Sequence, residues 1–540
     1  MQKNDLLSLR AENLGAEMEG VCRFEGMPVF VPGLLPGETA SVRIVKAEKK
    51  FAFGRLESPP DAPSPDRVSP DCGAYPQCGG CTARHMTYEA SLAAKRQHVR
   101  DCFLRIGHLD ISVPPVLGME HPLAYRNKTA LPCGGTADQP RLGFFAPRSH
   151  RLIPAVSCPN AMEPTAEIAR AVLGWMKQYR VTPYDEKNNC GFLRHLVVRV
   201  NREHRAMVTL VGHEKSLPHA RELIGSLIPL GAESICYNEN PKQTNVIFGS
   251  RFQLISGPET LSDTLCGLRF ELSPASFFQV NPAQTEVLYA AALDFAALRP
   301  QDTLCDVYCG AGTISLMMAK HCTRVTGIEI VPAAVQNAKE NARRNSIPNA
   351  SFHEGKAETL LPEMVREGLR PNVIVVDPPR KGLEPAVIDA IAQAAPDRLV
   401  YISCNPATQA RDAALLKEHG YEIRKIQPVD MFPFTSHIET VVQLSKGNIS
   451  SEKIRVEFNL EDMDMSGFRQ GATYEEIQAW VQEKYGFHVT HLNIAKTKQK
   501  CGILERQNYN LPKRKDSRSP ETPKEKEEAI IEAFKAYHML

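Results

Sequence analysis

The chain has 540 residues, of which 43% are hydrophobic and 23% are charged, as in an ordinary globular protein. A chain of this length is expected to fold into about three or four domains rather than around one core. The formal net charge of +2 excludes a strong overall attraction to nucleic acid, so any surface for RNA or DNA must be local.

The sequence contains no sign of a membrane protein. Its first residues, MQKNDLLSLRAENLG, lack the apolar core of a signal peptide, and no run of about 18 apolar residues follows. We therefore expect a cytoplasmic monomer with no membrane-spanning segment. The 15 cysteines of such a chain should be reduced thiols, some of which serve as metal ligands or nucleophiles.

Residues 1–58 are predicted to form a small OB-like β-barrel. Short β-rich runs alternate there with Gly and Pro turns. The second half of this region carries an excess of positive charge: Arg43, Lys46, Lys49, Lys50 and Arg55 against Glu48. Two interpretations remain open, a face that follows the RNA backbone or a solvated strand face.

Three further regions follow the barrel and a Pro-rich linker at 58–70. Residues 59–270 mix strands such as FLRHLVVRVN with helices such as TAEIARAVLGWMKQY, which predicts an α+β central domain. In residues 271–446, strands alternate with helices, which is typical of a doubly wound, Rossmann-like α/β sheet. Residues 447–540 combine an amphipathic helix, TYEEIQAWVQEKYG, with a basic stretch at 511–527 that we expect to be a solvated tail.

The α/β region begins with a glycine turn. Gly310 and Gly312 follow its first strand, but Ser315 replaces the third glycine of the dinucleotide pattern. The next strand ends at Glu329, where a carboxylate can accept both ribose hydroxyls of a nucleoside. Together with DPPR, which begins at Asp377, this predicts a nucleoside site at the C-terminal edge of the sheet. The alternative is a glycine turn that serves only packing.

A cysteine ends a later strand of the same sheet, in the stretch LVYISCNPA. A buried cysteine is usually a small hydrophobic residue, and Cys404 taken alone would be read so. Asp377 also ends a parallel strand, and HIETVVQLSK is expected to run antiparallel, so that Glu439 begins at the same edge. Glu439 and Cys404 are therefore expected to converge at this edge, which favours Cys404 as a nucleophile.

Four stretches carry a family resemblance: DVYCGAGTISL, VIVVDPPRKGL, YISCNPATQARD and SHIETV. They resemble the motifs of the RNA uracil-5-methyltransferases that use S-adenosylmethionine. Among these enzymes the chain is most similar to those that modify 23S ribosomal RNA. The resemblance covers residues 6–446, and the N-terminal barrel resembles the TRAM domain of that family. The SCNP and HIET pair is specific, whereas the glycine turn is not.

The resemblance also implies a role for individual residues. Cys404 would add to C6 of a uridine in 23S rRNA, and Glu439 would remove the C5 proton after methyl transfer. In the loop SFFQVNPAQTE, Phe277 would stack on the flipped base, with core packing as the alternative. The residues implied to bind S-adenosylmethionine are Gln279, Tyr308, Glu329 and Asp377, the last of which is alternatively a strand-end turn former.

Three cysteines in DCGAYPQCGGC have the spacing C-x5-C-x2-C: Cys72, Cys78 and Cys81. Thiols at this density in a reducing compartment usually bind metal, and a fourth ligand is then required. In the family, a cysteine at the place of Cys158 completes a 4Fe-4S cluster. Tetrahedral zinc is the alternative, because four thiolates hold either group. The triplet of radical S-adenosylmethionine enzymes is absent, so we expect a structural role for the cluster.

Two other functions remain as alternatives. One is a tRNA uracil-5-methyltransferase, which the barrel and the cluster cysteines disfavour, since the bacterial tRNA type resembled here generally lacks both. The other is a non-catalytic RNA-binding protein on a methyltransferase scaffold, which the presence of both Cys404 and Glu439 disfavours. The motifs YRNK (125–128) and LRHLVVR (193–199) also resemble the family's, as RNA-facing or supporting elements or as ordinary strand residues.

Overall fold

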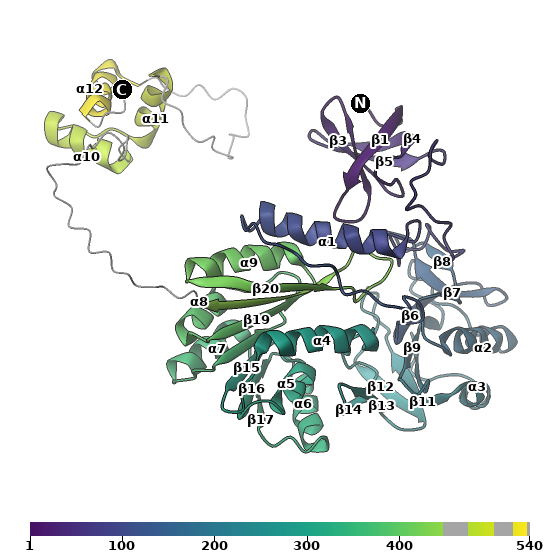
Figure 1. Ribbon diagram of the computed structural model, residues 1–540. Helices are drawn as coiled ribbons and strands as arrows, with labels where there is room; N and C mark the ends of the chain where they lie inside the picture. Colours follow the sequence, from purple (N-terminus) through teal and green to yellow (C-terminus); the bar gives the residue numbers. More distant parts are fainter. Residues whose placement is uncertain (447–473, 502–521, 537–540) are drawn as a thin grey trace. The chain divides into compact units, whose positions relative to one another are not determined.

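The computed structural model describes residues 1–446, 474–501 and 522–536 (Figure 1). The chain forms two compact units, Met1–Ile449 and Ser450–Leu540. The predicted basic stretch at 511–527 lies largely outside the described residues. Within the described part, no helix combines the length and the apolar character needed to cross a membrane.

The N-terminal strands close into a five-stranded barrel in the order β1-β2-β3-β5-β4, which confirms the predicted OB-like architecture. The strands are β1 (Leu6–Leu14), β2 (Gly20–Phe24), β3 (Met27–Val31), β4 (Thr39–Ala47) and β5 (Ala52–Leu56). Alternate side chains such as Leu9, Val29 and Val42 fill the barrel. The basic face is partly neutralised, because Arg43 and Arg55 both form ion pairs with Glu57.

The central region contains a seven-stranded mixed sheet in the order β12-β11-β10-β9-β6-β7-β8. Its strands are β6 (Lys128–Gly135), β7 (Pro140–Phe145), β8 (Leu152–Pro154), β9 (Leu193–Val200), β10 (Ala206–Gly212), β11 (Ala232–Glu239) and β12 (Arg251–Ser256). Helices α2 (Thr165–Gln178) and α3 (Ala220–Leu227) pack on it through Val172, Leu223 and their neighbours. Both faces of β9 and β10 are buried, which agrees with the nearly continuous apolar sequence of β10, whereas β9 also buries Arg194 and Arg199.

The methyltransferase-like sheet has seven strands in the order β17-β16-β15-β18-β19-β21-β20. They are β15 (Thr303–Val307), β16 (Arg324–Glu329), β17 (Ala350–Glu354), β18 (Val373–Val376), β19 (Arg398–Ser403), β20 (Tyr421–Val429) and β21 (Glu439–Lys446). All neighbouring strands are parallel except β21, which is antiparallel to both β19 and β20, as predicted.

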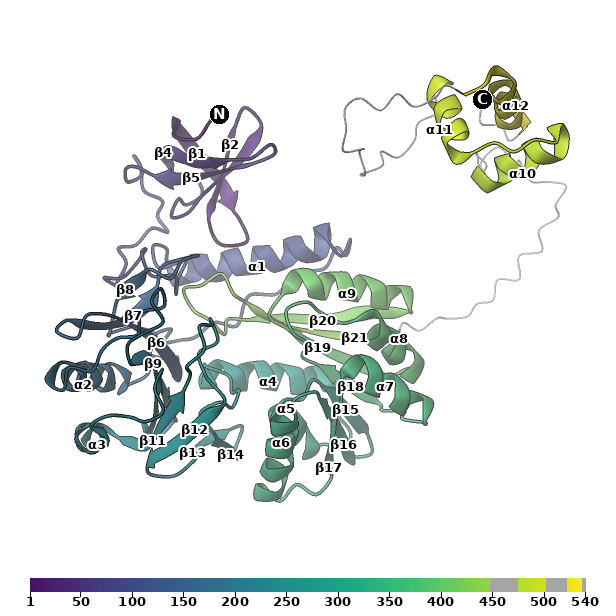
Figure 2. The same cartoon turned by 180° about the vertical axis from the view of Figure 1, so that it is seen from behind.

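Helices cover both faces of this sheet (Figures 1 and 2). One face packs against α4 (Pro282–Ala296), α5 (Thr313–Ala319), α6 (Pro332–Arg344) and the hairpin of β13 (Leu261–Leu265) and β14 (Leu268–Leu272). The other packs against α7 (Ala357–Arg366), α8 (Pro385–Ala394) and α9 (Pro406–Glu418). This is the doubly wound arrangement that the alternation of strands and helices predicts.

Helix α1 (Tyr88–Arg105) precedes the central sheet in sequence but packs beside α9 (Figure 1). Its residues Val99 and Phe103 are buried in the same core as α8 and α9. Lys95 of α1 donates to Asp430 Oδ1 at 2.5 Å and to the Phe432 carbonyl at 3.0 Å. Both side chains of this ion pair are fully buried. The chain segment after β20 is therefore held by α1, a helix that lies outside the predicted α/β region of residues 271–446.

The C-terminal unit contains α10 (Tyr474–Tyr485), α11 (His491–Lys500) and α12 (Lys524–Ala536). The three helices share a small core that includes Ile477, Val481, Ile494, Ile530 and Phe534. Helix α10 confirms the amphipathic helix predicted from TYEEIQAWVQEKYG.

Candidate active site

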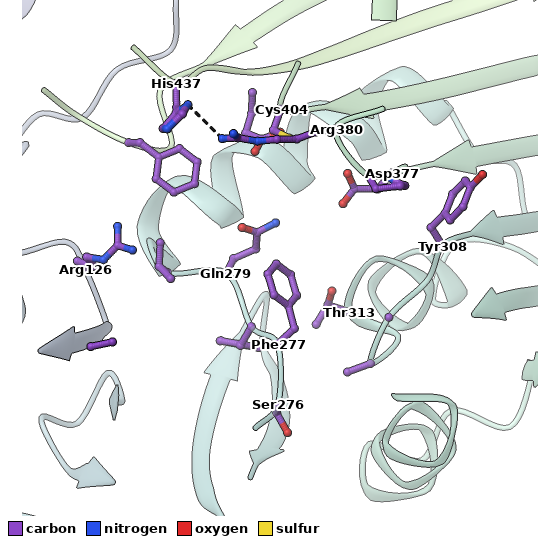
Figure 3. Close-up of a pocket in the computed structure, with 18 of the residues that line it drawn as sticks. Arg126, Ser276, Phe277, Gln279, Tyr308, Thr313, Asp377, Arg380, Cys404 and His437 are labelled. Atoms are coloured by element: carbon purple, nitrogen blue, oxygen red, sulfur yellow. Dashed lines mark hydrogen bonds between the residues drawn. The ribbon is translucent and has the colours of Figure 1, made fainter. Parts of the chain in front are cut away.

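A cavity of about 1370 Å³ opens at the C-terminal edge of the methyltransferase-like sheet and extends to the cysteine-rich segment. Figure 3 shows part of its lining, with Cys404, Asp377, Tyr308, Phe277 and Gln279 around one space. Every residue predicted from the sequence lines this cavity: Phe277, Gln279, Tyr308, Glu329, Asp377, Cys404, Glu439, Cys72, Cys78, Cys81 and Cys158.

Cys404 lies between β19 and α9, where the side chain of Asn405 caps the helix by accepting from Ala407 N at 3.2 Å. Burial, together with the charge of Glu439, raises the pKa of the Cys404 thiol, and the Arg380 guanidinium that hydrogen-bonds to it acts in the opposite direction. The N-terminal end of α9 also favours negative charge on the thiol. Arg380 is thus the group that stabilises a thiolate here.

Glu439 is the first residue of β21, opposite Val429 of β20. Burial and the charge of Asp377 raise the pKa of Glu439 well above its ordinary value, against the opposing charge of Arg380. Burial, and then the charge of Asp306, raises the pKa of Asp377 to about 7. A buried carboxyl with a raised pKa is a stronger base than an exposed one once it is ionised.

Arg380 and His437 are site residues that the sequence reasoning did not single out. Arg380 Nη2 lies 3.3 Å from His437 Nδ1 (Figure 3), so this ring nitrogen accepts the hydrogen bond. Burial, with Arg380 as the next cause, lowers the pKa of His437. Arg380 belongs to the DPPR motif and His437 to the SHIET motif. Their place in these motifs was the feature of the sequence from which a site role could have been predicted.

The nucleoside end of the cavity is formed by the glycine turn and Glu329. The carboxylate of Glu329 accepts from Gly310 N at 3.0 Å and from Val331 N at 2.8 Å. Gly312 has a φ of +81°, and a Cβ there would lie 3.1 Å from Ala338 Cβ and from the ring of Phe352. This glycine therefore serves a tight turn and close helix packing.

The loop before α4 carries Phe277 and Gln279 into the cavity (Figure 3). Phe277 is 77% exposed, so core packing does not account for it, whereas Phe278 is buried. Asn127 holds the loop by donating from Nδ2 to the Gln279 carbonyl at 3.1 Å and from N to the Val280 carbonyl at 2.8 Å. Arg199 Nη2 donates to the Ser276 carbonyl at 2.5 Å. Asn127 of the YRNK motif and Arg199 of the LRHLVVR motif thus support this loop.

The four predicted metal ligands face the same cavity. Burial raises the pKa of Cys78, and the charges of Cys81, Cys158 and Cys72 add to the rise, while the Gly80 N–H opposes it by donating to Cys78 Sγ at 3.3 Å. The other three thiols are thus within range for their charges to act on Cys78. Among the described residues, however, no three Cys, His, Asp or Glu side chains gather closely enough to hold a metal ion.

Comparison with known proteins places the chain among RNA-modifying enzymes. Residues 259–447 match the tRNA (Uracil-5-)-methyltransferase family, and residues 10–56 match the TRAM domain. An uncharacterized RNA methyltransferase of Clostridium tetani is 42% identical over 448 residues, which cover 82% of this chain and 97% of the relative. Another, from Halalkalibacterium halodurans, is 43% identical over 453 residues, 83% of this chain and 98% of the relative.

A solved structure agrees in fold over most of the chain. It is the Pyrococcus abyssi tRNA (uracil-54, C5)-methyltransferase in complex with S-adenosyl-L-homocysteine, with a TM-score of 0.66 and 25% identity, covering 81% of this chain and all of that one. The level of identity to RNA methyltransferases and the two matching domains lead to one conclusion: this chain belongs to the RNA uracil-5-methyltransferase family and carries an N-terminal TRAM domain.

Proposed function

We propose that the protein transfers a methyl group from S-adenosylmethionine to C5 of a uridine in 23S ribosomal RNA, through a covalent bond between Cys404 and C6. One observation carries this proposal. Cys404, Glu439 and Arg380 line the same cavity; the charge of Glu439 raises the pKa of the Cys404 thiol, and Arg380 opposes the rise in the pKa of both groups. A nucleophile, a base and a cation therefore share one cavity.

The chemistry needs both groups because C5 of uracil is a poor nucleophile. The Cys404 thiolate bonds to C6, and the electrons of the C5–C6 double bond move toward O4, which makes C5 reactive. S-adenosylmethionine, when bound, supplies the methyl group to C5 and leaves as S-adenosylhomocysteine. Glu439 then takes the C5 proton, the electrons of that C–H bond restore the C5–C6 double bond, and the C6–S bond breaks to return the thiolate.

The residues at the nucleoside end fit the cofactor that this reaction requires. Glu329 is held at the strand end by two backbone N–H groups, in the position that suits ribose hydroxyls. The other residues proposed to bind S-adenosylmethionine are Gln279, Tyr308 and Asp377, all of which line the same cavity. The exposed ring of Phe277 is proposed to stack on the flipped uracil.

The choice of 23S rRNA rests on the TRAM domain and the four cysteines, which accompany the ribosomal type in the family resemblance. The alternative substrate, tRNA, is supported by the archaeal structural neighbour, which acts on uracil 54 of tRNA. Incubation of the enzyme with separate 23S rRNA and tRNA fractions, followed by nucleoside mass spectrometry, distinguishes the two substrates. 5-Methyluridine in neither fraction would support the non-catalytic alternative.

The order of events at Cys404 and Glu439 gives a first prediction. Glu439→Gln keeps the shape of the side chain but removes the base, so addition and methylation should proceed while release stalls. With radiolabelled methyl donor, a denaturing gel should show a slow band that contains protein, RNA and label. Release should fall by about 100-fold or more, the usual contribution of a general base.

Cys404→Ala is the control for this experiment, because without the thiol neither adduct nor product should form. A Glu439→Gln enzyme that turns over near the wild-type rate without a trapped band would show that Glu439 is not the base. A labelled band from Cys404→Ala would mean that the nucleophile is another residue.

The buried carboxyl of Asp377 should reduce stability above neutral pH. Folding raises the pKa of Asp377 from 3.8 to about 7, so the folded state binds the proton more tightly than the unfolded state does. The free energy of unfolding therefore falls as the pH rises between these two pKa values. Asp377→Asn should therefore raise the urea midpoint of unfolding at pH 8. The gain should shrink as the pH falls below about 7 and vanish only below about pH 3, where the carboxyl is protonated in both the folded and the unfolded state.

Asp61→Asn is the control for Asp377, because Asp61 is exposed in the linker and its charge should not affect the urea midpoint. A lower midpoint for Asp377→Asn at pH 8 would contradict the expectation and would mean that the carboxylate has a stabilising partner.

We also propose that Cys72, Cys78, Cys81 and Cys158 bind a 4Fe-4S cluster, which their shared cavity and mutual charge effects support. Protein purified without oxygen should absorb broadly at about 400 nm, as expected for iron bound by thiolates. Cys78→Ser should abolish this absorption, and Cys190→Ser, a change at an exposed thiol, should not. Colourless protein with stoichiometric zinc would contradict the cluster.

The barrel is proposed to contact the RNA backbone through Lys49 and Lys50, which are exposed on the β4–β5 turn. Changing both to Gln should lower the slope of log affinity against log salt by about 2, since each phosphate contact contributes about 0.9. Arg43→Gln is the matched control, because Glu57 already pairs with Arg43. An unchanged slope in the double variant would mean that this face is only a solvated surface.

A further inference from the structure

The segment that leads into Glu439 is held by groups from outside its own sheet. Tyr125 OH donates to the Pro433 carbonyl at 3.4 Å. The N–H groups of Thr82 and Ala83, which follow Cys81 directly, both donate to the Phe434 carbonyl at 3.0 Å. Residues 431–437 thus connect β20 to the proposed base through a path that the cysteine-rich segment fixes.

Phe434 is the strained residue of this segment. Its φ of +64° lies in the left-handed region, which is unfavourable for an aromatic residue and persists only where the surroundings impose it. The Arg84 guanidinium lies 4.4 Å from the centre of the Phe434 ring, and the Tyr88 ring lies 5.7 Å away. Arg84 therefore holds the side chain of a residue whose backbone is under strain.

The same guanidinium joins the segments that carry the four cysteines. Arg84 is buried and bonds to Asp71, next to Cys72, and to Asn160, two residues after Cys158. The guanidinium also lies near enough to the Cys81 thiol to lower its pKa against the larger effect of burial. Asn160 Nδ2 in turn donates to Cys81 Sγ at 3.6 Å and to Tyr125 OH at 3.5 Å.

We propose that Arg84 is a positioning residue for proton abstraction, which couples the four-cysteine site to the 431–437 segment and so to Glu439. The inference rests on the proposed function for the role of Glu439. Arg84 contacts neither Glu439 nor Cys404 in any described interaction, so it acts through Phe434. The segments that carry the four cysteines hold Arg84 in place through Asp71 and Asn160. Arg84 in turn holds Phe434 and so fixes the backbone that leads to Glu439.

Arg84→Met tests this coupling, because methionine retains much of the apolar stem and loses the guanidinium. In single turnovers with labelled methyl donor, methyl transfer should stay near the wild-type rate. Release should slow by about 10- to 100-fold, the effect of a misplaced catalytic group, so that a methylated protein–RNA adduct accumulates. The 431–438 peptide should exchange its amide hydrogens faster than in the wild type, a measurement that needs no turnover.

Arg194→Met is the matched control. Arg194 is also buried, donates to the carbonyls of Asn240, Lys242 and Thr244, and stacks on the Tyr184 ring at 4.2 Å. This variant should neither trap the adduct nor change exchange at 431–438. Phe434→Leu is the second test, since it removes the ring while leaving Arg84 and the cysteines unchanged. It should reproduce the slow release even if Arg84→Met disrupts the four-cysteine site.

Unchanged exchange and prompt release in Phe434→Leu would overturn the inference, as would faster exchange without an adduct. If the wild-type enzyme forms no 5-methyluridine in any RNA, the proposed function fails instead. The exchange measurement then still decides whether Arg84 fixes the segment.

Discussion

Strand β21 is antiparallel to β19 and pairs Thr440 with Ser403, so Cys404 and Glu439, which adjoin this last pair, lie at the same edge of the sheet. The parallel strands end at this edge, so Asp377, after β18, reaches the same space. Because one strand of this otherwise parallel sheet is reversed, Cys404 and Glu439 come to the same edge although 35 positions separate them in the sequence. A shift of one residue would turn Glu439 to the opposite face of the sheet.

This arrangement concentrates acidic groups where water is scarce. Burial is the main cause that raises the pKa of Asp306 to about 6 and that of Asp377 to about 7, and it also raises the pKa of Glu439 well above its ordinary value. Buried carboxylates destabilise a fold unless a cation or donors compensate them. Arg380 lies among these groups and also beside the thiol. Such a cluster is unfavourable for stability and suited to binding a cationic sulfonium and to removing a proton.

The sequence alone was enough to predict which residues lie at the C-terminal edge of the sheet, because chain order and strand direction determine where each strand ends. Glu439, Cys404 and Asp377 could be assigned to one edge before any contact was known. The supporting residues could not, because they depend on tertiary contacts across the chain. Arg84 hydrogen-bonds to Asn160, which lies 76 positions away in the sequence, and Asn127 hydrogen-bonds to the Gln279 carbonyl, which lies 152 positions away. Helix α1 likewise joins the α/β core, although its position in the chain suggested the central domain.

Two segments that complete the cavity are held from outside the methyltransferase-like sheet. Asn127 and Arg199 of the central region hold the loop with Phe277 and Gln279, and the cysteine-rich segment holds residues 431–437. The sheet alone therefore positions Cys404, the proposed nucleophile, and Glu329, whereas the segment before Glu439 and the exposed ring of Phe277 are held by contacts from outside it. The approach of Glu439, the proposed base, thus depends on contacts from the central region and the cysteine-rich segment as well as on the register of the sheet.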